Sequence, residues 1–184
     1  MSKLKIWRLE VDFKDYPSFK LINEDTQYLK KFKERIFVAK ELGNDFRYEQ
    51  IELIEGKSKT DCPMFWSATG TPLISKYAAE VLCEVFGDDV ELLPVQYGDE
   101  VYFIVNILAV LDAIDYERST FRKLTTGLVV GLEEYKLIPK VIKNHKILKL
   151  VLNGRTMATE VFVNQEFKYK VESSGLKGFK FVEV

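Results

Sequence analysis

Acidic residues between positions 88 and 117 are the side chains of this sequence best suited to chemistry or to binding a charged partner. They fall into three groups, at residues 88–91, 99–100 and 112–117. The candidate partner-binding residues are Asp88, Asp89, Glu91, Asp99, Glu100, Asp112, Asp115 and Glu117. Loops on one side of a sheet can gather such residues into an anionic patch that steers a cationic partner. The ordinary alternative is that acidic loops only keep the protein soluble.

The same carboxylates do not form a recognisable catalytic or metal-binding motif. A hard cation needs several converging oxygens, and no EF-hand loop surrounds Asp112 and Asp115. Their spacing does not fix the separation that two catalytic carboxylates require. His145 is the only histidine, which excludes two-histidine sites, and no serine lies in a G-x-S-x-G motif. We therefore predict no catalytic residues, no metal site and no cofactor.

Cysteine and glycine patterns exclude further classes of site. Cys62 and Cys83 match no zinc or redox spacing and are interpreted as free thiols of a cytoplasmic protein. The glycines form neither a G-x-G-x-x-G motif nor a P-loop. No apolar stretch of signal-peptide length starts the chain, and no run approaches the roughly 20 apolar residues of a membrane span. We expect a cytoplasmic location and no membrane contact.

Charge is unevenly distributed along the 184 residues, although the formal net charge is only −1. Residues 61–120 carry 2 Lys and Arg against 11 Asp and Glu, whereas residues 121–184 carry 12 against 6. A near-neutral total argues against a general polyanion binder. Basic stretches at 30–35 and 136–149 nevertheless leave a second function open, a nucleic-acid-associated or regulatory binding module. Acidic neighbours dilute the first stretch, and apolar residues between the lysines of the second indicate a half-buried element.

Periodicity and turn residues predict the elements that position these side chains. Helices are expected at residues 26–42, 76–86 and 165–173, with Thr26, Ser75 and Asn164 as N-caps and with Gly43, Gly87 and Gly175 just past their ends. Within the first of these, Ile36-Phe37-Val38-Ala39 could equally begin a strand. Strands are expected at residues 3–11, 18–22, 48–54, 90–96, 101–108, 127–131, 146–152 and 177–184, with a further one within 62–72.

The arrangement of these elements indicates the fold class. The first strand should have one covered face, and the strand at 101–108 should be covered on both faces. Turns are predicted at Gly98-Asp99 and Asn153-Gly154. Because helices and strands mix without strict alternation, we predict an α+β fold with a mixed, mostly antiparallel sheet and a few short helices. Residues 1–184 are expected to form a single compact domain.

Five different short motifs of core and turn residues follow one another over the last two thirds of the chain. They are Gly70-Thr71-Pro72-Leu73-Ile74-Ser75-Lys76, Val90-Glu91-Leu92-Leu93-Pro94-Val95, Tyr102-Phe103-Ile104-Val105-Asn106-Ile107, Leu111-Asp112-Ala113-Ile114-Asp115 with Ser119, and the tail from Glu172 through Gly175-Leu176-Lys177-Gly178 to Phe181. Over residues 60–184 the sequence resembles a bacterial family of immunity proteins from polymorphic-toxin systems, formerly catalogued as a domain of unknown function. Residues 1–59 match only loosely and form a more variable N-terminal part.

The resemblance implies a small cytoplasmic protein that binds a cognate toxin domain and blocks it by stoichiometric protein–protein contact. It transfers no catalytic residue to this sequence. Asp112, Asp115 and Ser119 are the polar positions of the matched motif. Their alternative role is local, because Asp and Ser side chains bond backbone amides in turns.

Overall fold

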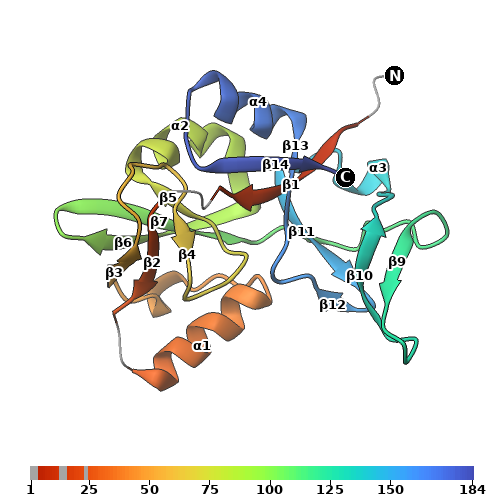
Figure 1. The fold of residues 1–184 in the computed structure, drawn as a ribbon, viewed down its shortest axis with the longest axis horizontal. Coiled ribbons are helices and arrows are strands. Elements are labelled where there is room, and N and C mark those ends of the chain that lie inside the picture. The colour runs from red at the N-terminus through yellow and green to blue at the C-terminus, as the bar shows by residue number, and fades with distance from the viewer. Residues whose placement is uncertain (1–3, 13–15, 23–24) are drawn as a thin grey trace.

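The computed structural model describes residues 4–12, 16–22 and 25–184 of the chain. One six-stranded sheet, called sheet A here, is assembled from both ends of the sequence (Figure 1). Its strand order is β12 (Arg155–Thr156), β11 (Ile147–Leu152), β13 (Val161–Asn164), β1 (Ile6–Val11) and β14 (Phe179–Glu183), and β8 (Val110–Leu111) pairs in parallel with β11.

The first strand, β1, lies inside sheet A between β13 and β14. Leu9 is paired with Val161 on one side and with Phe181 on the other. Ile6 is buried in one core cluster, whereas Trp7 and Leu9 are buried in another. The prediction of a strand with one covered face is therefore wrong, since side chains on both faces of β1 are buried in core clusters.

A second six-stranded sheet, called sheet B, has the order β4 (Met64–Phe65), β2 (Ser18–Leu21), β3 (Glu49–Glu55), β6 (Val90–Tyr97), β7 (Glu100–Ile107) and β5 (Leu73–Ser75). The β6–β7 hairpin turns at Gly98-Asp99, as predicted. Strand β7 has neighbours on both edges and buries Ile104 and Val105 in different core clusters, which confirms that both of its faces are covered.

Two helices have the predicted limits because their caps are local. Helix α2 (Lys76–Phe86) begins after Ser75, whose hydroxyl accepts the Ala78 N–H at 3.1 Å, and ends at Gly87. Helix α4 (Gln165–Ser173) begins after Asn164, whose side chain accepts the Phe167 N–H at 3.0 Å.

Helix α1 (Thr26–Phe37) departs from the prediction at both ends. Asp25 is the N-cap in place of Thr26, and its carboxylate accepts the N–H groups of residues 27 and 28. The helix ends at Phe37 rather than at 42, because the chain leaves the helical conformation at Ala39, whose φ is +54°. A short 3₁₀ turn, Gly43–Asp45, follows.

Three core clusters hold the layers together. Helices α2 and α4 share one cluster with β1, β5, β7 and β13, and therefore join the two sheets. Helix α1 covers the other face of sheet B. Short helix α3 (Pro139–Ile142) and the hairpin of β9 (Thr120–Lys123) and β10 (Val129–Glu134) share the third cluster with β1, β11 and β13. The α+β class and the single compact domain are confirmed.

Candidate functional site

Asp89 is bonded within the fold. Its carboxylate lies 2.7 Å from Nδ1 of His145 and accepts the Lys146 N–H at 3.1 Å. The Asp89 side chain is only 15% exposed. These contacts hold the connection between α3 and β11 against the start of β6, and they give His145 a partner that the sequence did not reveal.

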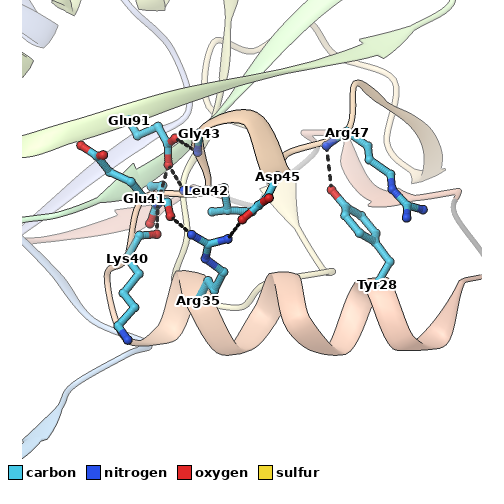
Figure 2. A network of polar contacts seen from close by, with 10 residues as sticks. Tyr28, Arg35, Lys40, Glu41, Leu42, Gly43, Asp45, Arg47 and Glu91 are labelled. Carbon is cyan, nitrogen blue, oxygen red and sulfur yellow. Dashed lines mark hydrogen bonds and ion pairs between the residues drawn. The ribbon is translucent and has the colours of Figure 1, made fainter.

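Glu91 is also engaged internally, at the segment that follows α1. Its carboxylate accepts the N–H groups of Leu42 at 2.9 Å and Gly43 at 2.7 Å. It accepts a third bond, at 2.9 Å, from the side-chain amide of buried Asn106, which also donates to the Lys40 carbonyl. Figure 2 shows Glu91 facing these backbone groups from the strand above. Glu91 therefore ties residues 40–43 to β6.

Arg35 completes this network from the helix side (Figure 2). Its guanidinium pairs with Asp45 at 2.5 Å and donates to the Glu41 carbonyl. The turn after α1 is thus held by charged groups from two directions, which explains why the helix stops where it does.

Asp115 has the local turn role that was the alternative for the motif at 112–119. Its carboxylate accepts the Arg118 N–H at 3.2 Å, and its backbone carbonyl accepts the Ser119 N–H at 2.9 Å. The Ser119 hydroxyl in turn bonds both backbone groups of Lys136. Two of the three polar positions of this motif, Asp115 and Ser119, therefore fasten a turn to the β10–α3 connection.

The other five predicted residues are exposed and do not gather in one place. Asp99 and Glu100 lie at the tip of the β6–β7 hairpin, whereas Asp88, Asp112 and Glu117 lie beyond its opposite end. Strand β6 has 8 residues, so at about 3.3 Å per residue the two ends are roughly 23 Å apart. The structure does not bring the three sequence groups into one patch.

Asp99 and Glu100 line a cleft of about 840 Å³, the hairpin cleft. Its walls are the hairpin tip, the loop at 56–61, the first turn of α2 and the segment before β14. Its polar and tyrosine lining residues include Lys57, Lys59, Asp61, Lys76, Tyr77, Tyr97, Asp99, Glu100, Tyr102 and Lys177. Burial and the neighbouring Glu100, whose carboxylate accepts the Tyr102 hydroxyl at 3.2 Å, raise the pKa of Tyr102 to about 12.

Asp61 joins three walls of the hairpin cleft. Its carboxylate accepts the Ser75 hydroxyl at 2.8 Å and the Lys177 N–H at 2.9 Å. Its backbone bonds the same two residues, accepting from Ser75 N–H and donating to the Lys177 carbonyl. The N-cap serine of the family-like motif is therefore part of the cleft floor.

Gly178 allows the segment before β14 to pack directly against residues 60–62. Its φ is +89°, and a Cβ there would lie 2.1 Å from Oγ1 of Thr60 and 2.8 Å from the Cys62 carbonyl oxygen. Only glycine fits such a conformation at such a distance. Gly178 belongs to the tail motif, and it is required there because the tail passes close to the backbone of residues 60–62 beside the cleft.

Four lysines surround the hairpin cleft, and all are exposed: Lys57, Lys59, Lys76 and Lys177. Within the described part of the chain, their only ion pair is Lys76 with Glu80, at 4.0 Å. The sequence did not reveal this group, because its members come from three distant segments. The alternation Lys57-Ser58-Lys59 was the only local signal.

The basic stretch at 136–149 is not a continuous cationic strip. Lys149 is 1% exposed and donates to the Ala158 carbonyl at 2.9 Å, and burial lowers its pKa to about 8. Lys146 pairs with Glu166. The half-buried interpretation of this stretch agrees with these contacts.

The described residues include no group of three or more His, Cys, Asp or Glu placed to hold a metal ion. Cys62 is buried and Cys83 exposed, both are free, and burial raises the pKa of Cys62 to about 12. None of the helices in residues 4–12, 16–22 and 25–184 is long and apolar enough to cross a membrane.

Comparison with known proteins identifies a family. No curated protein matches the chain. A family model does match, from residue 48, just before β3, to residue 184. This match starts 12 residues earlier in the chain than the sequence resemblance, which began at residue 60. The match over residues 48–184 covers about three quarters of the sequence and confirms the resemblance, and the chain therefore belongs to the Immunity protein family (Imm11).

Proposed function

We propose that this protein neutralises a cognate bacterial toxin domain by binding to it stoichiometrically in the cytoplasm. Membership of an immunity protein family is the observation that carries the proposal. The protein acts by contact rather than by catalysis, so its useful chemistry is that of an interface.

The hairpin cleft and its rim are the surface we assign to the toxin. Tyr77 is 55% exposed there, and Tyr97 and Tyr102 line the same concavity. Tyrosine is enriched at protein interfaces because it offers a large contact area and a polar end at little cost in conformational entropy. Asp99 and Glu100 extend from the same hairpin and supply carboxylates for cationic groups of the toxin.

The other exposed acids, Asp88, Asp112 and Glu117, are candidates for long-range steering rather than for the central contact. They lie beyond the far end of the hairpin. The carboxylates of Asp89, Glu91 and Asp115 are bonded inside the fold, so we propose that they support the surface rather than touch the partner.

Co-expression with the toxin domain encoded beside this gene tests the proposal. We expect growth to be restored and a one-to-one complex to be recovered by size-exclusion chromatography. Persistent growth arrest without a complex would contradict the function. The double variant Asp99→Lys/Glu100→Lys should bind the toxin domain with at least tenfold lower affinity, on the order of the loss of a close charge contact. The matched double variant Asp88→Lys/Asp112→Lys should mainly lower the association rate constant.

A further inference from the structure

We infer that the hairpin cleft receives an acidic segment of the toxin domain, with Lys57, Lys59 and Lys177 as the groups that recognise its carboxylates. This inference rests on the proposed function and deepens it. It assigns negative charge to the part of the toxin that enters the cleft, whereas the acidic residues of the sequence indicate only a cationic partner.

Charge balance in the cleft is the first support. Four lysines and three acidic residues line it, and the acids Asp99 and Glu100 belong to the hairpin tip, whereas Lys57, Lys59 and Lys177 belong to the loop at 56–61 and to the segment before β14. The Asp61 carboxylate bonds Ser75 and Lys177 N–H, and the Glu100 carboxylate accepts from Tyr102. The ammonium groups of Lys57, Lys59 and Lys177 form no ion pair with the described residues. The loop at 56–61 and the segment before β14 therefore present three lysines and one acid, Asp61, and this local excess of positive charge attracts carboxylates.

The shape and lining of the cleft indicate a segment rather than a small ion. Its volume of about 840 Å³ has room for several side chains. Phe19, Leu53 and Val101 line it together with the tyrosines, so apolar surface lies beside the ammonium groups. A segment with apolar or aromatic residues between its carboxylates fits both features.

The lysines are attached to a rigid frame. Lys177 is held through both of its backbone groups by Asp61, and its carbonyl also accepts the Thr60 hydroxyl at 3.1 Å. The neighbouring Gly178 packs against Thr60 and Cys62 without room for a Cβ. A surface that is already in its bound conformation loses less entropy when the partner arrives.

Single-stranded nucleic acid is the competing ligand, because lysines and tyrosines also bind phosphates and bases. Asp99 and Glu100 on the same rim oppose it, since a continuous phosphate backbone would pass these carboxylates. A protein segment can present carboxylates to the lysines and a cationic residue to the rim. The mixed lining therefore favours a protein partner.

Charge reversal in the cleft tests the inference. The double variant Lys57→Glu/Lys59→Glu, called the cleft pair, is compared with the double variant Lys123→Glu/Lys140→Glu, called the control pair. The control pair makes the same change of charge on β9 and α3, which lie on the opposite side of the molecule from the β6–β7 hairpin (Figure 1). All four lysines are exposed. Calorimetric titration with the toxin domain at low and physiological salt should show binding weakened at least roughly tenfold by the cleft pair.

The control pair should bind within about twofold of the wild-type protein, and the neutral pair Lys57→Gln with Lys59→Gln should fall between the cleft pair and wild type. Equal melting temperatures show that the variants are folded. If the wild-type protein itself does not bind the toxin domain, the proposed function fails and the inference fails with it.

If the wild-type protein binds but the cleft pair binds equally well, the inference is overturned and the proposed function stands. A fluorescent single-stranded oligonucleotide provides the other decisive arm. If the oligonucleotide binds the wild-type protein but not the cleft pair, and both proteins bind the toxin domain equally well, the cleft is a nucleic-acid site and the inference is wrong.

Discussion

At the scale of single residues, neighbouring carboxylates of one acidic segment have opposite roles. Asp88 is exposed at the end of α2, whereas Glu91, three residues later, accepts three hydrogen bonds. Both look alike in the sequence. Their difference arises because β6 carries Glu91 past the backbone of residues 42 and 43, which are far away in the chain.

Replacing Glu91 by alanine should lower the free energy of unfolding by about 2–3 kcal/mol, because two N–H groups and the buried Asn106 amide lose their acceptor. Urea unfolding measures this change. The matched substitution Asp88→Ala should stay within about 0.5 kcal/mol of wild type. Equal effects of the two substitutions would show that Glu91 does not hold this segment.

Lys149 is the residue whose protonation should affect stability most clearly. Its pKa of about 8 lies below the ordinary 10.5, so the unfolded chain binds more protons between these values. Stability therefore rises with pH in this window and is flat below it. Relative to Lys149→Met, the wild-type protein should gain about 2 kcal/mol between pH 7 and pH 9.5.

Parallel urea unfolding of both proteins at several pH values provides this comparison, and groups that titrate in both proteins cancel in the difference. A stability difference that stays constant across this pH range would mean that Lys149 titrates normally in the folded protein.

At the scale of elements, caps and close approaches decide where segments begin and how they meet. Ser75 and Asn164 cap helices at the predicted positions, because an N-cap needs only residues within its own turn. Helix α1 differs, since its end depends on Glu91 and Asn106 of sheet B. A local prediction could not include those partners.

Substituting Gly178 by alanine should destabilise the protein by about 3 kcal/mol or more, since the new Cβ would overlap Thr60 and the backbone at Cys62. Gly98→Ala is the matched control, because that position has a φ of +56° and open space around it. The control should cost only about 1–2 kcal/mol, the strain of a left-handed alanine. Denaturant midpoints compare the two, and similar losses would contradict a steric role for Gly178.

At the scale of the whole molecule, the N-terminal residues are structural members of both sheets. Strand β1 separates β13 from β14, and β2 joins β3 to β4. The family match begins only at residue 48. A looser match therefore does not make the preceding segment dispensable, because its strands supply backbone pairing and buried side chains.

A truncated protein comprising residues 48–184 should not fold cooperatively. It lacks β1, so β13 and β14 lose their shared partner and the cores lose Ile6, Trp7 and Leu9. Circular dichroism during thermal unfolding, with hydrogen exchange of the β13 amides, tests this expectation. A sharp transition with protected β13 amides would show that the family-matched region is an independent unit.

The sequence alone determined the fold class, the limits of α2 and α4, the β6–β7 hairpin and the family resemblance, because these depend on periodicity, caps and turns within a few residues. It could not determine which carboxylates are free, since Glu91 and Asp89 meet partners about 50 residues away. Only the tertiary structure places Lys57, Lys59 and Lys177 around one cleft. Hydrogen bonding and burial depend on contacts that the chain makes after it folds, and those contacts decide whether a charged side chain supports the fold or remains available to a partner.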